Sequence, residues 1–254
     1  MSSPLIIAHR GASAYAPENT LAAFQLAAEQ GADGLEFDVQ LSSDGIPVVI
    51  HDADVRRVSG LDKRVADLTA RELGQLDVGS WFNAVRGDTK FAGESVPTLA
   101  QTLEAAASFR GPIYVELKCG NATYQPLAGA VCDIARDSPL LPRIIIKSFR
   151  LAAIPEIRSQ LPTVQTAALF APSIRKVLRK KRFIVAMARE FGAHQLSLHR
   201  SLATSKLCRL AADAGMPVTV WTVDAPKWLI RAERQSIQAL ITNDPARMLA
   251  QRDS

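Results

Sequence analysis

The chain has 254 residues, 48% of them hydrophobic, which is enough to bury the core of one large α/β domain. Its 30 Lys and Arg residues exceed its 25 Asp and Glu residues, and the formal charge of +5 modestly favours anionic ligands such as phosphates without indicating nucleic acid. Three cysteines without Cys-x-x-Cys spacing indicate neither a zinc site nor a disulfide framework, and the apolar N-terminal run is too short for a signal or membrane segment, so we expect a cytoplasmic protein.

Short apolar or β-branched segments alternate with longer amphipathic segments almost from end to end. This alternation is typical of successive βα units around a parallel sheet. The predicted strands cover residues 5–8, 34–39, 113–117, 143–147, 163–169, 194–198, 217–220 and 239–242. The predicted helices cover residues 20–30, 99–108, 125–136, 150–160, 173–191, 204–214, 226–235 and 245–251. Eight such units predict an α/β fold, a closed (β/α)₈ TIM barrel that forms a single domain over residues 1–254.

One segment, residues 52–97, interrupts the alternation and is predicted to be a small insertion after the second strand. Within it, residues 67–73 have the pattern of a short capped helix and residues 79–82 that of an aromatic loop. We expect this insertion to lie over the barrel mouth, where its aromatic side chains would shape a substrate pocket.

A hairpin is predicted at the end of the second strand, with the apolar run after Pro47 as its return arm. If Asp44 and Gly45 are the central residues of a two-residue type I′ turn, Asp38 faces His51 in a non-hydrogen-bonded pair. Pro47 then also occupies a position that needs no N–H donor. A three-residue turn with a glycine bulge would shift the pairing by one residue and remove this opposition.

Carboxylates gather at the ends of two predicted strands. Glu36 and Asp38 are two residues apart and point to the same face of one strand, and Glu116 lies near the end of the next strand of the barrel. Ionised carboxylates on one face repel each other unless a cation or a basic partner compensates them. Three carboxylates at one barrel mouth predict an oxygen-rich site for one divalent cation, Mg²⁺ or Ca²⁺ rather than zinc.

Two histidines from separate elements would face that cation. One imidazole, His9 or His51, can take a proton from an attacking oxygen while the other gives one to a leaving alkoxide, as the cleavage of a phosphodiester requires. Arg10 and Lys118 would neutralise the non-bridging phosphate oxygens. Trp221, at the end of the seventh barrel strand, is a further candidate for substrate contact.

Other polar features have a structural interpretation. Residues 173–183 form a basic amphipathic pattern, which predicts a solvated helix face or, alternatively, a surface for weak contact with anionic lipid. His194 and His199 are interpreted as a strand-edge residue and a loop residue. For Asn19 and Thr20, at the start of the first helix, a capping role and a substrate contact both remain open.

The sequence resembles the glycerophosphodiester phosphodiesterase family over nearly its whole length. The opening block that carries the resemblance is His9-Arg10-Gly11-Ala12, Pro17-Glu18-Asn19-Thr20, Glu36-Phe37-Asp38-Val39-Gln40 and His51-Asp52. Later segments follow in family order: Asp67-Leu68-Thr69, Gly79-Ser80-Trp81-Phe82, Val96-Pro97-Thr98-Leu99, Glu116-Leu117-Lys118, Lys147-Ser148-Phe149, Val220-Trp221-Thr222-Val223 and Thr242-Asn243-Asp244-Pro245.

This resemblance implies hydrolysis of glycerophosphodiesters to glycerol 3-phosphate and an alcohol, in glycerol and lipid metabolism. It implies a divalent cation at Glu36, Asp38 and Glu116, acid and base roles for His9 and His51, and phosphate contacts from Arg10 and Lys118. The attacking group would be either the adjacent glycerol hydroxyl or a water held by the cation.

The chain departs from the family pattern after Lys118, at Asp224 where asparagine is common, and over residues 236–240. These departures leave open which alcohol is released. One alternative is a lysophospholipase D-like or other phosphodiesterase on the same barrel. Another is a phosphate-ligand binding protein without catalysis, and the oligomeric state is open as well.

Overall fold

The computed structural model describes residues 3–87, 89–172 and 181–254, and these form one nine-stranded sheet. The strand order is β1-β9-β8-β7-β6-β5-β4-β2-β3, and a further pairing of β1 with β2 closes the sheet into a barrel. All pairings are parallel except that of β2 with β3. The strands are β1 Leu5–His9, β2 Gly34–Leu41, β3 Pro47–Val49, β4 Ile113–Leu117, β5 Ile144–Ser148, β6 Gln165–Phe170, β7 Gln195–His199, β8 Val218–Trp221 and β9 Ala239–Thr242.

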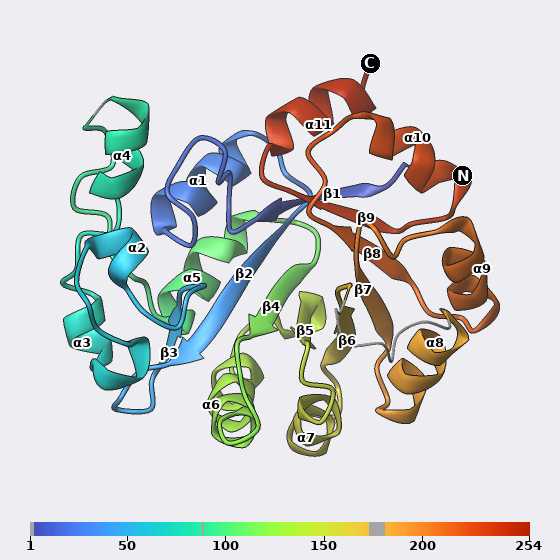
Figure 1. Cartoon of the computed structure of the whole chain (residues 1–254), viewed down its shortest axis with the longest axis horizontal. Helices are drawn as coiled ribbons and strands as arrows, with labels where there is room; N and C mark the ends of the chain where they lie inside the picture. The colour runs from blue at the N-terminus through green and yellow to red at the C-terminus, as the bar shows by residue number, and fades with distance from the viewer. Residues whose placement is uncertain (1–2, 88, 173–180) are drawn as a thin grey trace.

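Helices surround this barrel, as Figure 1 shows. Those that follow barrel strands are α1 Leu21–Glu29, α5 Leu99–Ala105, α6 Tyr124–Arg136, α7 Ala153–Gln160, α8 Lys181–Glu190, α9 Ser205–Asp213, α10 Lys227–Arg234 and α11 Pro245–Arg252, with 3₁₀ turns η2 Ala106–Ser108 and η3 Leu141–Arg143. The predicted (β/α)₈ TIM barrel is therefore confirmed. Most of the basic run 173–183, including the first part of the helix predicted there, lies outside the described residues.

The core has an outer and an inner part. Two large apolar clusters, around Phe37 and around Leu198, contain both strand and helix residues and so fill the space between barrel and helices. A smaller cluster around Tyr114 is made of strand residues alone and fills the barrel interior. The hydroxyl of Tyr114 forms a hydrogen bond of 3.1 Å with Thr219, so this buried polar group has a partner inside the barrel. No described helix is long and apolar enough to cross a lipid bilayer.

The insertion after β3 contains α2 Arg56–Ser59, η1 Val65–Asp67, α3 Ala70–Leu73 and α4 Ser80–Arg86. It has an apolar cluster of its own and lies beside β2 and β3 in Figure 1. The predicted short helix is confirmed, with a reciprocal capping box between Thr69 and Glu72. The predicted aromatic loop is wrong, because the Asp77 carboxylate accepts the backbone N–H groups of Gly79 and Ser80 and so starts helix α4 there.

The predicted register of the hairpin is also wrong. The backbone N–H of Ile50 donates to the carbonyl of Asp38 at 3.0 Å, so Asp38 faces Ile50 and not His51. The turn has three residues and ends at Gly45 with φ of 76°, which is the glycine-bulge geometry. Pro47 follows the residue that closes the turn in both registers, so its missing N–H could not distinguish them.

Candidate active site

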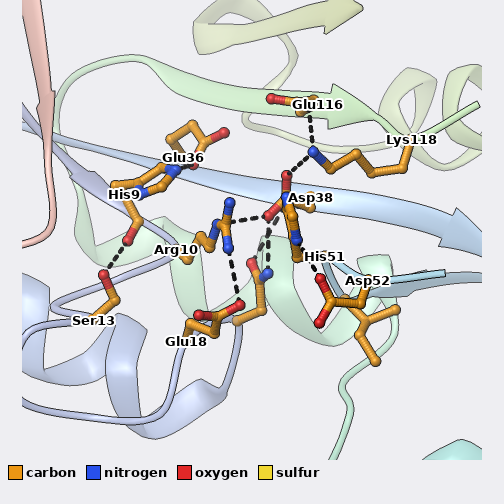
Figure 2. A network of polar contacts seen from close by, with 12 residues as sticks. His9, Arg10, Ser13, Glu18, Glu36, Asp38, His51, Asp52, Glu116 and Lys118 are labelled. Atoms are coloured by element: carbon orange, nitrogen blue, oxygen red, sulfur yellow. Dashed lines mark hydrogen bonds and ion pairs between the residues drawn. The ribbon is translucent and has the colours of Figure 1, made fainter. Parts of the chain in front are cut away.

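Strand register brings the charged side chains together at the C-terminal end of the barrel. His9 on β1 pairs with Glu36 on β2. Two residues further along β2, Asp38 pairs with Glu116 on β4, which in turn pairs with Lys147 on β5. Paired residues of neighbouring parallel strands point to the same side of the sheet, so these side chains share one mouth. Figure 2 shows most of this network.

The three carboxylates of Glu36, Asp38 and Glu116 are all buried, and each offers an oxygen within 4.8 Å of the others. The Oε2 atom of Glu36 is buried and accepts no hydrogen bond from any described residue. A buried anionic oxygen without a donor is costly unless a cation compensates it. Three hard oxygen ligands with one of them unsatisfied fit a divalent cation of the Mg²⁺ or Ca²⁺ type.

Asp38 is the most heavily contacted of the three acids. Its Oδ2 lies 3.0 Å from Arg10 Nε and accepts a hydrogen bond of 3.0 Å from the Asn19 amide, and its Oδ1 lies 3.2 Å from Lys118 Nζ. Burial by itself would raise the pKa of Asp38, but Arg10, Lys118 and the charge of His51 outweigh it and hold the pKa well below its usual range. Asp38 therefore stays ionised in the folded protein well into the acid range.

This pKa shift predicts how the contribution of Asp38 to the free energy of unfolding changes with pH. Because the folded pKa lies below the unfolded value of about 3.9, the contribution is complete above that value and is lost as the pH falls towards the folded pKa. In chelator, the free energy of unfolding of wild type minus that of Asp38→Asn should stay constant from about pH 7 to about pH 5 and shrink below about pH 4. Urea unfolding at each pH measures it.

The matched control for this experiment is Asp133→Asn, at an exposed carboxylate on α6 that pairs only with Arg136. An exposed pair contributes little, so this variant should stay close to wild type at every pH. A difference for Asp38→Asn that does not change between about pH 5 and about pH 3 would contradict the lowered pKa.

Lys147, which the sequence analysis did not select, completes the cluster. Its Nζ lies 2.7 Å from Oε1 of Glu36 and 3.4 Å from Oε2 of Glu116. Burial acts to lower the pKa of Lys147, but Glu36 and Glu116 outweigh it and raise the pKa above its usual value. The sequence signal was a lone cation directly after three isoleucines on a buried strand.

His9 is oriented by an amide. Its Nδ1 lies 2.7 Å from Oδ1 of Asn243, whose own Nδ2 donates to Asp224 at 3.1 Å. Asp224 also accepts the backbone N–H of Asn243 at 2.7 Å. Because Asn243 presents its oxygen to the ring, the network assigns a hydrogen to Nδ1, so the neutral form of the His9 ring has its lone pair on Nε2, which lies 3.8 Å from Oε2 of Glu36. The departure at Asp224 thus serves to fix Asn243.

His51 is oriented by a carboxylate instead. Its Nδ1 lies 2.7 Å from Oδ1 of Asp52, and Oδ2 of Asp52 accepts from Arg57 Nε at 2.6 Å. Arg57 belongs to the insertion and also reaches Glu18 at 2.7 Å, which in turn pairs with Arg10 at 2.9 Å. Burial would raise the pKa of Asp52, but hydrogen bonds from Arg57 and His51 lower it. A chain of alternating charges thus links Arg10 to His51 through the insertion.

Comparisons with known proteins agree with this site. Residues 9–247 match the family described as "Glycerophosphoryl diester phosphodiesterase family". A curated glycerophosphodiester phosphodiesterase of Caldanaerobacter subterraneus is 31% identical over 96% of both chains. The chain belongs to this family. It is therefore an enzyme of the phosphodiesterase class, and membership together with the acidic site supports a divalent cation.

Solved structures of glycerophosphodiester phosphodiesterases extend the likeness. A phosphodiesterase of Oleispira antarctica, solved with the product sn-glycerol-3-phosphate, superposes with a TM-score of 0.87 at 27% identity and covers 99% of this chain and 98% of its own. The Thermotoga maritima glycerophosphodiester phosphodiesterase superposes with a TM-score of 0.75 at 25% identity, over 98% of each chain. Both superpositions thus cover nearly the whole chain, with the barrel and the insertion.

At the start of the first helix, Thr20 has the capping role and Asn19 instead contacts the acidic cluster. Thr20 is the N-cap of α1 and accepts the N–H of Ala23, whereas Asn19 turns its amide to Asp38. Asn19 and Arg10 both adopt left-handed backbone conformations, with φ of 59° and 57°, and the N–H of Asn19 donates to the carbonyl of Arg10. Each costs of order 1 kcal/mol or more, and such strain is common at active sites of enzymes.

The remaining predicted residues lie on or directly before strands that follow β4. Trp221, at the end of β8, packs edge to face against Phe149 and His199, with ring centroids 5.6 and 5.3 Å away. His199 is the last residue of β7, so it belongs to this aromatic cluster and is not an isolated loop residue. His194 keeps its structural interpretation, because its Nδ1 accepts the backbone N–H of Thr166 at 3.0 Å.

Proposed function

We propose that this enzyme hydrolyses glycerophosphodiesters to glycerol 3-phosphate and an alcohol, with one divalent cation, Mg²⁺ or Ca²⁺, as cofactor. The observation that carries the proposal is the meeting of three buried carboxylates with two histidines, each of which has its Nδ1 engaged. A phosphate-binding module without catalysis does not need two proton carriers. The product bound to the Oleispira antarctica relative supports the choice of substrate class.

Glu36, Asp38 and Glu116 would hold the cation, which would supply a positive charge to stabilise the charge that develops on the phosphoryl group. Arg10 and Lys118 would bind the non-bridging phosphate oxygens, since both cations already lie at the edge of this cluster against Asp38. Trp221 would contact the substrate through its ring.

His9 is proposed as the general base and His51 as the general acid. The Nε2 of His9 is free to accept the proton of the attacking oxygen, which belongs to the neighbouring glycerol hydroxyl or to water. The Asp52 carboxylate holds the His51 ring through Nδ1 and stabilises a protonated imidazole, as an acid that protonates the leaving alkoxide requires. After the transfer, the roles reverse for hydrolysis of any cyclic intermediate.

Arg57 is expected to be a positioning residue for His51. In Arg57→Gln, Asp52 loses its ion pair and holds the ring less firmly, so kcat should fall by about tenfold with little change in KM, and the pH dependence of kcat should change. Steady-state kinetics over a range of pH measures both effects. The control is Arg56→Gln on the same helix, where the exposed side chain pairs with exposed Asp62. Equal effects of the two substitutions would contradict the role of Arg57.

A lysophospholipid would be the alternative substrate of the same site. The basic run 173–183 that would support weak contact with anionic lipid lies mostly outside the described residues. A cytoplasmic location remains a prediction, with which the three free cysteines agree. The insertion is proposed to shape the entrance for the alcohol group, because Arg57, Val58 and Val78 line a small cavity next to His51.

A substrate panel tests the proposed function. Glycerophosphocholine, glycerophosphoethanolamine and glycerophosphoinositol should be cleaved faster than lysophosphatidylcholine, with each of Mg²⁺ and Ca²⁺ tested at saturating concentration. Preference for the lysolipid, with a rise in rate when vesicles are added, would favour the alternative. Tight binding of the panel without product would contradict the enzymatic assignment of the site.

A further inference from the structure

Lys147 differs from the other two cations that touch the acidic cluster. Its side chain is 2% exposed, compared with 21% for Lys118 and 17% for Arg10. It lies within β5, one residue before the end of the strand, between Glu116 of β4 and Ala167 of β6. Lys118 lies one residue beyond the end of β4. Lys147 is therefore enclosed within the cluster, whereas Lys118 is partly open to solvent.

We propose that Lys147 is a fixed positive charge of the cation site, which holds Glu36 and Glu116 together and makes tight binding of the divalent cation depend on a phosphate anion. The inference rests on the proposed function, because it assumes that Glu36, Asp38 and Glu116 hold the cation. It assigns to Lys147 a role towards the cation and none in the proton transfers.

The charges of the cluster support this role. The three carboxylates already contact the three cations Arg10, Lys118 and Lys147, of which Arg10 also pairs with Glu18, so much of their negative charge is compensated before a divalent cation binds. A divalent cation adds two positive charges next to the buried ammonium of Lys147, and this repulsion weakens the binding of the cation. A bound phosphate anion restores the balance. Cation and anion should therefore bind with positive coupling, each raising the affinity for the other.

The contacts of Lys147 also predict an effect on the protein without its cation. Glu36 and Glu116 come from different strands, and the ammonium lies within 3.4 Å of both. Without it, Lys118 still pairs with Glu116 at 2.7 Å, but the buried Glu36 carboxylate loses its ammonium partner, which destabilises the fold. A divalent cation would take over this function, so the loss of stability should disappear when it is added.

Calcium titration by isothermal calorimetry tests the proposal, with Lys147→Met as the main variant and Lys147→Gln as a second that keeps a hydrogen-bond donor. Without anion, both variants should bind Ca²⁺ roughly tenfold or more tightly than wild type. Inorganic phosphate should raise the Ca²⁺ affinity of wild type and do so less in the variants. In chelator, the melting temperature of Lys147→Met should fall below that of wild type, and excess Ca²⁺ should remove the difference.

The control is Lys206→Met on α9, which removes the same charge from an exposed position far along the chain. Its Ca²⁺ affinity should equal that of wild type. Folded Lys147→Gln with unchanged or weaker Ca²⁺ affinity would overturn the role of Lys147 and leave the proposed function standing. If neither wild type nor variant bound Ca²⁺ or Mg²⁺, the cation site itself would be wrong, and this inference with it.

Discussion

Alanine in place of His9 or His51 is expected to lower kcat for a glycerophosphodiester by about 100-fold or more, because each substitution removes one of the two proton carriers. Both variants should keep their fold, because neither ring lies in an apolar cluster. At the barrel mouth, His9 is held by Asn243 and His51 by Asp52. Steady-state rates of wild type and both variants, with circular dichroism to check folding, give the measurement.

His194→Ala is the matched control for these substitutions. This histidine directly precedes β7, its ring bonds to Thr166 of β6, and among the described residues it is not part of the acidic group. Its kcat should stay within a few-fold of wild type. A near-normal kcat in folded His9→Ala and His51→Ala would show that neither residue transfers a proton. A large fall in kcat in only one of the two variants would contradict the assignment of two proton carriers.

Removal of divalent cations is the second change with a large expected effect. A chelator should lower the rate by about 100-fold or more, because a cation beside the phosphoryl group supplies several kcal/mol of stabilisation. Mg²⁺ or Ca²⁺ in excess should restore it. Glu36→Gln, which replaces an anionic ligand by a neutral amide, should require a higher cation concentration for half-maximal rate. Full activity in chelator would exclude the proposed cofactor.

Most of the barrel could be predicted from the sequence because it depends on local patterns. Buried parallel strands give short apolar runs, and the reactive residues of a barrel follow these runs, so His9, Glu36, Asp38 and Glu116 could be placed at one mouth from their positions alone. The structure brings these four side chains together.

The parts that were missed depend on contacts between distant segments or on one residue of turn length. The hairpin register depends on whether Ser43 belongs to the turn. The sequence does not distinguish the two registers, because Pro47 fits both. Asn243, directly after the last strand, contacts His9, and Arg57 of the insertion contacts Asp52, which holds His51. No periodicity marks such residues, because their role is set by the closed barrel.

His51 illustrates both outcomes. Its assignment to the site did not depend on the predicted pairing with Asp38. Although Ile50, the residue before His51, faces Asp38, His51 is still close enough to act electrostatically on that carboxylate. What orients its ring is Asp52, its neighbour in sequence, together with Arg57 from the insertion. The insertion is thus part of the catalytic apparatus in this account and not only a cover beside the barrel.

Product analysis tests the central claim most directly. Purified enzyme is incubated with glycerophosphocholine and Mg²⁺ or Ca²⁺, and the products are followed by phosphorus NMR and by an enzymatic assay for free choline. We expect glycerol 3-phosphate and choline in equal amounts, with no reaction in chelator. Phosphocholine and glycerol in their place, or the same products at the same rate in chelator, would contradict it.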